Sequence, residues 1–330
     1  MAVRSVLLVV LTALSTLYIV NASWVPGLLG QENVQDPVLL SIGGIHHPFE
    51  QGARDADECV ANAVQDGAPP FIENTIPALE AAYSAGADLI AIDIQPTIDG
   101  DFAVFRDSVV NCRTNGAGET RTYTMSQLKR LDIGYGYTAV RGLSYPFRYR
   151  GVGLMPSLDD IIQRFPIRRI ILNLRSEKEN DGNILAAYLK GYAPEILKNI
   201  IVLGDDKPIN ALQARIPSLT VTTPKRIRDC LDQYVLLGWL TIVPEVCKET
   251  VLLLPADYID WLPGWPHRFH NRFENAGTTY FLIEEFTREQ QIQGIDTQQA
   301  LLAMPPQYQG GIATNRIELV APAISDLSTN

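Results

Sequence analysis

The sequence predicts a (β/α)8 barrel built on a parallel sheet. Short apolar runs alternate with amphipathic helical patterns through most of the chain. Strands that alternate with helices imply a parallel sheet covered on both faces. The chain has 330 residues, of which 46% are hydrophobic, so it can bury the core of one barrel-sized domain. We expect that domain over residues 37–317, between a separate segment 1–22 and a C-terminal tail 318–330.

Eight apolar runs, bounded by Gly, Asp or Pro, are the expected barrel strands. They are residues 37–42, 89–94, 102–105, 169–174, 200–203, 219–222, 279–283 and 311–314. A ninth run, 240–243, competes for one of these places. Helix starts are indicated by hydroxyl residues that can cap a first turn, at Thr75, Thr124, Ser157 and Thr297.

Residues 1–22 have the pattern of a targeting segment. Arg4 precedes an apolar run from residue 6 to 20, and small residues then suit cleavage after Ala22. The same run also suits an uncleaved membrane anchor, with Tyr18 and Trp24 at the interface. Signal peptide and anchor both stay open. Either one predicts an exported protein, whether secreted, periplasmic or membrane-anchored.

The charge balance excludes one class of partner. The formal net charge is -10, whereas nucleic-acid binding needs a basic surface, so we expect no nucleic-acid partner. Attraction to anionic lipid headgroups is disfavoured for the same reason.

The four cysteines suit an oxidising compartment, where an even number of cysteines indicates disulfides. No two are spaced as C-x-x-C, which argues against a zinc site. Of the three possible pairings, we expect Cys59 with Cys112 and Cys230 with Cys247.

Residues 71–134 carry the most informative motifs. E-N-T occupies 73–75, A-G-A-D occupies 85–88, T-x-D-G occupies 97–100, R-T-x-G-x-G occupies 113–118 and L-x-x-L-D occupies 128–132. This order resembles the glycerophosphodiester phosphodiesterase family. The resemblance implies a (β/α)8 barrel that hydrolyses glycerophosphodiester or lysophospholipid-like ligands in lipid metabolism. It also implies a divalent cation, calcium or magnesium.

The family pattern uses two histidines for proton transfer and holds the cation with a Glu-x-Asp pair and a further Glu. Ile42 falls at the first histidine and Arg106 at the second. Ala91 replaces the first metal glutamate, Asp93 remains, and Asn173 stands where the last carboxylate is common. Isoleucine cannot carry a proton, arginine stays protonated, and one carboxylate is a poor cation site. These residues predict weak or absent hydrolysis and no intact cation site.

Nearby residues suggest two ways to compensate. His46 and His47 follow the first strand, and with Glu73 and Asp93 they could form a relocated catalytic site; alternatively they are solvated loop imidazoles. Glu73 either lines the pocket or belongs to a helix entry capped by Thr75.

Arg106 and Arg175 follow expected strands and would face the barrel mouth. Two guanidinium groups there suit the binding of an anion without turnover. The competing function is thus a non-catalytic protein that binds an anionic phospho-headgroup or a protein partner. Alternatively, Arg106 and Arg175 have a structural role. They would then form ion pairs with Asp93 and Asp107 that close the site left by the missing catalytic residues.

The segment 261–273 places Trp261, Trp265, Phe269 and Phe273 at helical spacing. Such a segment, like the N-terminus, could contact a membrane. A helix that covers the barrel would show the same pattern.

Overall fold

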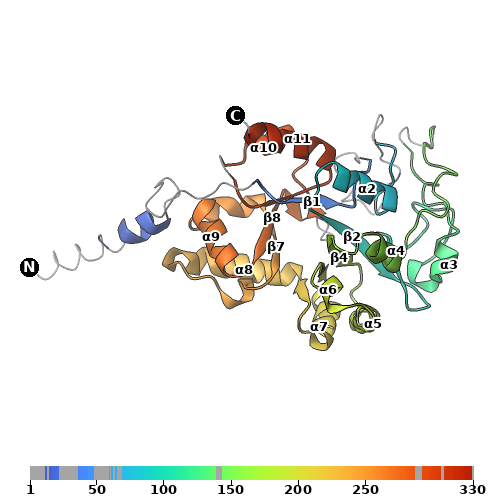
Figure 1. The fold of residues 1–330 in the computed structure, drawn as a ribbon, viewed down its shortest axis with the longest axis horizontal. Coiled ribbons are helices and arrows are strands. Elements are labelled where there is room, and N and C mark those ends of the chain that lie inside the picture. Colours follow the sequence, from blue (N-terminus) through green and yellow to red (C-terminus); the bar gives the residue numbers. More distant parts are fainter. Residues whose placement is uncertain are drawn as a thin grey trace, which may run out of the picture.

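A nearly closed barrel of parallel strands forms the centre of the computed structural model, which describes residues 12, 15–21, 36–47, 59, 61, 64, 69–138, 143–286, 292–305 and 308–328 (Figure 1). In sheet order the barrel strands are β6 (Thr220–Thr222), β5 (Ile200–Gly204), β4 (Arg169–Leu174), β2 (Leu89–Pro96), β1 (Leu39–Ile42), β11 (Gly311–Thr314), β8 (Thr279–Ile283) and β7 (Val251–Pro255). Most of their residues are buried, as expected for strands covered on both faces. The predicted fold class is confirmed.

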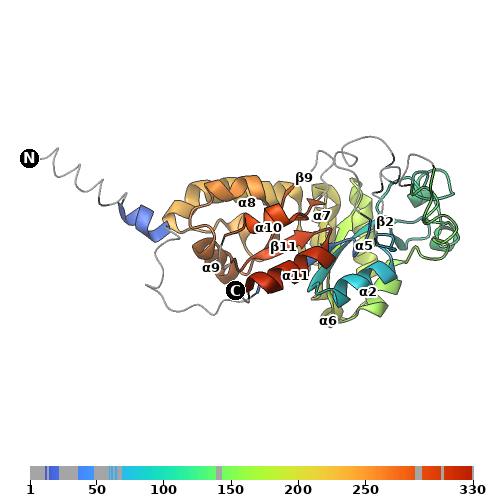
Figure 2. The ribbon, with the colours of Figure 1, turned by 90° about the horizontal axis from the view of Figure 1, so that it is seen from above.

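Helices surround the barrel on its outside, except α3 (Met125–Leu128), which lies apart from it at one end of the molecule (Figures 1 and 2). They are α2 (Ile76–Ser84), α3 (Met125–Leu128), α4 (Leu158–Arg164), α5 (Glu179–Leu189), α6 (Pro194–Leu197), α7 (Asp206–Arg215), α8 (Pro224–Leu237), α9 (His267–Asn275), α10 (Gln298–Leu302) and α11 (Ile317–Ser328). Short 3-10 turns are η2 (Thr120–Thr122), η3 (Gly238–Leu240), η4 (Glu245–Cys247) and η5 (Ala256–Trp261). A small hairpin pairs β9 (Glu285–Phe286) with β10 (Ile292–Gln293).

The predicted helix starts lie where the hydroxyl residues mark them. Thr124 and Ser157 form capping boxes at the starts of α3 and α4, and Thr297 accepts a hydrogen bond from the backbone of α10. Thr75 also precedes its helix, although its hydroxyl donates to the carbonyl of Ile72 instead of capping. These starts are local features, which explains why sequence patterns found them.

One predicted barrel strand forms a strand but is not part of the barrel. The run 102–105 forms β3 (Phe102–Val104), which pairs antiparallel with β2 and lies outside the barrel path. The connection between β2 and β3 is too short for the crossover that parallel strands need. Thr97 instead closes a tight hairpin turn, in which its N–H donates to the carbonyl of Asp101 at 2.9 Å.

The missing barrel strand is β7, which no predicted run covered. The competing run 240–243 is not a strand, because η3 ends at Leu240 and Thr241 adopts a left-handed backbone conformation with φ 63°. Every residue of β7 is buried. A short, wholly apolar run has no alternating pattern to distinguish it.

The barrel has one seam, between β6 and β7, which do not pair as strands. Side chains bridge it: the Thr250 hydroxyl donates to the carbonyl of Val221 at 3.0 Å. Arg226 of α8 donates from Nε to the carbonyl of Val246 at 3.0 Å. The Cys230–Cys247 disulfide joins α8 to η4 on the same side.

The predicted tail from residue 318 is instead part of the barrel. It forms α11, in which Val320 is buried and packs with the main core. Both views show α11 beside α2 (Figures 1 and 2), and Ala321 lies close to Gly86, which follows α2. The barrel domain therefore extends past the predicted boundary at residue 317.

The described chain between β2 and α4, residues 97–138 and 143–156, forms a lobe with its own small core. Phe105, Met125 and Phe147 belong to this core, which is separate from the main barrel core. The Cys59–Cys112 disulfide ties the lobe to the segment that precedes α2. Both expected cysteine pairings are thus present.

At the other end of the long axis, residues 15–21 form helix beside α8 and α9 (Figure 1). Most of the predicted targeting segment 1–22 lies outside the described residues. Within the described part of the chain, no helix is both long enough and apolar enough to cross a bilayer.

Candidate functional site at the strand ends

Strand register sorts the predicted site residues into two rows on one face of the sheet. Ile42 of β1 pairs with Ala91 of β2, so the two substituted family positions are immediate neighbours. Two residues further along, Asp93 of β2 pairs with Asn173 of β4. The same row continues to Thr222 of β6 through a residue of β5. Most side chains in the lower part of this face are apolar, with Thr220 of β6 as an exception, and Asp93, Asn173 and Thr222 lie toward the carboxyl ends, where barrel sites form.

The Asp93 carboxylate is held by two amides. Asn173 Nδ2 donates to Asp93 Oδ1 at 2.6 Å, and Asn74 Nδ2 approaches Oδ2 at 3.5 Å. In return, the Asp93 N–H donates to Asn74 Oδ1 at 3.1 Å. Asn74 can make these bonds because its backbone has a φ of 60°, in a turn that asparagine tolerates. The one surviving metal carboxylate is therefore engaged within the protein.

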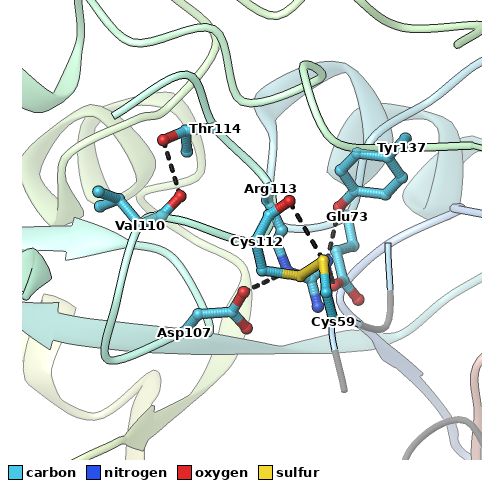
Figure 3. Close-up of a disulfide and its surroundings, with 8 residues drawn as sticks. All are labelled: Cys59, Glu73, Asp107, Val110, Cys112, Arg113, Thr114 and Tyr137. Carbon is cyan, nitrogen blue, oxygen red and sulfur yellow. Dashed lines mark hydrogen bonds and ion pairs between the residues drawn. A yellow bond between two sulfur atoms is a disulfide. The ribbon is translucent and has the colours of Figure 1, made fainter. Parts of the chain in front are cut away.

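Glu73 forms a buried ion pair with Arg113 of the lobe (Figure 3). Arg113 Nε also donates to Asp107 at 2.8 Å, and Nη1 donates to the Tyr137 hydroxyl at 2.5 Å. Only 2% of the Arg113 side chain is exposed. Burial alone would lower the pKa of Arg113, but Asp107 and Glu73 outweigh it and hold that pKa well above its ordinary value. The sequence suggested that Glu73 lines the pocket or belongs to a helix entry. Neither interpretation included its main contact, the ion pair with Arg113 that joins the lobe to the barrel.

His46 and His47 are buried rather than solvated. His46 Nε2 lies 4.0 Å from Glu73 Oε2, and its Nδ1 lies 2.7 Å from the carbonyl of His47. The His47 ring packs edge-on against Phe147, and neither of its nitrogens has a hydrogen-bond partner among the described residues. Burial, with a smaller effect of His46, lowers the pKa of His47 to about 4. The reading as solvated loop imidazoles is wrong for both residues.

Arg106 and Arg175 are half-buried at the ends of β3 and β4. The carbonyl of Arg106 accepts from Gln95 Nε2 at 3.1 Å, and the N–H of Arg175 donates to the carbonyl of Ile94 at 3.1 Å. Burial and the nearby Glu177 raise the pKa of Asp205, and the charge of Arg175 acts in the opposite direction. Arg175 therefore lies within electrostatic reach of the acidic groups after β5.

The two carboxylates of the expected site-closing ion pairs have other partners in the structure. Asp107 accepts from Arg113, and Asp93 accepts from Asn173 and Asn74. Among the described residues, no ion pair within 4.0 Å forms at the guanidinium of Arg175.

The described residues do not fit a divalent cation at the family position. Ala91 offers no ligand, and Asn173 turns its amide nitrogen toward Asp93, the carboxylate that remains at the family's cation positions. Nowhere in the described part of the chain do three His, Cys, Asp or Glu side chains gather into a cation cluster. A hard cation wants several oxygen ligands at once. The sequence also has Glu50, Asp55, Asp57 and Glu58 after the first strand. All four lie outside the described residues, so the prediction of no intact site stays a prediction.

Sequence reasoning missed three residues that organise the site: Asn74, Arg113 and Tyr137. Asn74 and Arg113 were visible within the E-N-T and R-T-x-G-x-G motifs. Their roles depend on bonds to residues 19 and 40 positions away. Tyr137 had no signal in the sequence.

The segment 261–273 packs mainly on the protein itself. Phe269 and Phe273 of α9 are buried against Tyr234 and Tyr280. This arrangement is that of a helix covering the barrel, whereas Trp261 remains 69% exposed. A membrane contact of this segment stays a proposal.

Fold and site together define the class: a (β/α)8 barrel whose polar strand-end residues gather around β2 and β4. A sequence model described as "Glycerophosphoryl diester phosphodiesterase family" matches residues 64–267, more than half of the chain. The chain belongs to this family.

Solved structures agree on the fold. The glycerophosphoryl diester phosphodiesterase domain of an uncharacterized Mycobacterium tuberculosis protein superposes with a TM-score of 0.60 at 18% identity, over 87% of this chain and 99% of that one. An Oleispira antarctica phosphodiesterase, crystallised with the product sn-glycerol-3-phosphate, gives a TM-score of 0.56 at 15% identity, over 88% and 97% of the two chains.

Curated relatives match over shorter stretches. A glycerophosphodiester phosphodiesterase of Bacillus subtilis is 34% identical over 103 residues, which are 30% of this chain and 34% of the relative. A glycerophosphodiester phosphodiesterase of Caldanaerobacter subterraneus is 44% identical over 62 residues, 19% of this chain and 26% of the relative. The matches thus span about a quarter to a third of these relatives.

Proposed function

We propose that this protein binds the phosphate-bearing headgroup of a glycerophosphodiester or lysophospholipid at the carboxyl ends of its barrel strands, without hydrolysing it by the two-histidine route. The family and the sn-glycerol-3-phosphate bound to the Oleispira antarctica phosphodiesterase support the ligand class. The observation that carries the proposal is the pairing of Ile42 with Ala91 below a polar upper row. Among the described residues this face offers groups that can bind but no histidine, and its carboxylate, Asp93, is engaged by Asn173 and Asn74.

Two groups are suited to hold the ligand. Arg175 supplies a half-buried cation after β4, and a guanidinium binds phosphate oxygens in a bidentate manner. Thr222 supplies a buried hydroxyl in the row of Asp93, and this hydroxyl has no hydrogen-bond partner among the described residues. A buried hydroxyl without a partner costs free energy that a bound ligand could recover.

A second candidate is hydrolysis at a relocated site. The 4.0 Å approach of His46 to Glu73 favours it. In that case, His46 would transfer the proton, and the ion pair between Glu73 and Arg113 would have to open. The burial of these groups, which are at most 9% exposed, makes this the weaker candidate.

Calorimetric titration of the purified full chain with sn-glycerol 3-phosphate and with glycerophosphocholine tests the proposal. We expect binding of at least one ligand and no release of glycerol 3-phosphate with added calcium or magnesium. Arg175→Gln should weaken binding at least tenfold, because a charge-assisted contact is lost. Arg215→Gln, an exposed arginine on α7, is the matched control and should change affinity less than twofold.

Thr222→Val sharpens the test. It should weaken binding roughly three- to tenfold and leave the stability of the free protein equal or higher, because the hydroxyl has no partner to lose. Metal-dependent release of glycerol 3-phosphate that disappears in His46→Gln would establish the second candidate instead. Absence of binding to both ligands would refute the proposal.

A further inference from the structure

One end of the molecule carries a cluster of exposed apolar side chains, which we call the apolar end face. Leu236, at the end of α8, is 74% exposed, and Trp261 of η5 is 69% exposed. Single exposed apolar residues are ordinary, but a contiguous group marks an interaction site. The face comprises Tyr18, Leu236, Trp239, Leu240, Ile242 and Trp261.

These residues lie together although they come from three parts of the chain. Tyr18, Trp239 and Trp261 line one groove with a volume of about 290 Å³. Leu236 and Leu240 flank Trp239 along the chain where α8 passes into η3. Figure 1 shows the helix of residues 15–21 at this end, beside α8 and α9 and away from α3.

Asn21 fastens the N-terminal segment to the barrel domain. Its Nδ2 donates to the carbonyl of Trp239 at 3.0 Å, and its Oδ1 accepts from Arg272 Nη1 at 3.0 Å. Arg272 also donates to the Tyr234 hydroxyl and the Gly238 carbonyl, both at 3.0 Å. Only 8% of Asn21 is exposed. The clamp holds the helix of residues 15–21, which includes Tyr18, at the apolar end face.

We propose that the N-terminal segment is retained in the mature protein and that the apolar end face seats the protein on a zwitterionic phospholipid bilayer. Tryptophan and tyrosine combine an apolar ring with a polar edge, and they favour the membrane interface. In the sequence, the apolar run 6–20 directly precedes Asn21, and we assign this run to the same bilayer. The choice of a zwitterionic bilayer follows from the net charge of -10 and from Asp260, which lines the groove. This proposal is independent of the proposed function.

Flotation of the full chain with phosphatidylcholine vesicles tests the proposal. The variant Leu236→Ser/Trp239→Ser/Trp261→Ser should lower the partition coefficient at least tenfold. The matched control is Ile98→Ser/Leu143→Ser/Ile167→Ser, which removes apolar residues that are 67%, 86% and 83% exposed elsewhere. It should float within twofold of the unaltered chain. Equal thermal unfolding midpoints in all three proteins would show that folding is not the cause.

Three outcomes would overturn the proposal. The first is equal flotation of the face variant and the unaltered chain, or no flotation of either. The second is a dimer in sedimentation experiments that only the face variant abolishes, which would make a second copy the occupant of the face. The third is an intact mass of the exported protein that begins at Ser23, because the clamp through Asn21 would then be lost.

Discussion

The side-chain amide of Asn173 donates a 2.6 Å hydrogen bond to the carboxylate of Asp93, across the paired strands β4 and β2. The bond joins two of the residues that stand at the family's cation-binding positions. A carboxylate left alone between apolar strands would be costly, so the amide replaces some of the stabilisation that a cation would provide.

Asn173→Leu should therefore lower the free energy of unfolding by about 1 kcal/mol, because Asp93 is half-buried and loses a charge-assisted bond. Urea unfolding within a double-mutant cycle that includes Asp93→Ala would isolate this bond. A coupling energy near zero would contradict the structural role assigned to the pair.

The buried ion pair between Glu73 and Arg113 should be one of the most sensitive points of the fold. Glu73→Gln should cost about 3–5 kcal/mol in urea unfolding, because it leaves a buried guanidinium undercompensated. Glu80→Gln is the matched control, since Glu80 pairs with Arg164 on the surface, with side chains 41% and 57% exposed. An exposed pair contributes less than about 1 kcal/mol. Equal costs for the two variants would refute the anchoring role of Glu73.

The disulfide Cys230–Cys247 should protect the seam of the barrel. The double variant Cys230→Ala/Cys247→Ala should lose about 3 kcal/mol of stability, the expectation for a loop of this size, because the two cysteines are 17 positions apart. Hydrogen exchange should rise first in β6 and β7, which are joined only by side chains. Removal of Cys59 and Cys112 should leave hydrogen exchange in β6 and β7 unchanged. Faster exchange of these strands in this control would contradict a specific role of Cys230–Cys247 at the seam.

His47 should make the protein sensitive to acid. Its pKa is about 4 in the folded protein and near 6.5 when solvated, so the unfolded chain binds more protons between these values. Stability should therefore fall as the pH drops through 6.5 toward 4, by up to about 3 kcal/mol, and this loss should level off below pH 4. His47→Phe should flatten the unfolding profile over this range. His267→Gln, on α9, should leave the profile unchanged; if it has the same effect as His47→Phe, the assignment to His47 is wrong.

The sequence predicted those parts of the fold that depend on local patterns. The helix starts at Thr124, Ser157 and Thr297 follow from side chains that bond within three residues. Strand runs and the family motifs predicted the barrel and placed Asp93 and Asn173 at strand ends. The substitutions Ile42 and Ala91 were likewise visible in the chain itself, because only the identity of the side chain was needed.

Only the tertiary structure decided which segments meet. In the folded protein, residues 102–104 pair antiparallel with β2, and β7 pairs with β8 in the barrel. Glu73 binds Arg113, 40 positions away, and His47 is buried against Phe147. The tertiary structure also placed Asn21 beside Trp239 and Arg272. The physical reason is that burial and long-range hydrogen bonds arise from packing between distant segments, and local sequence patterns do not record such packing.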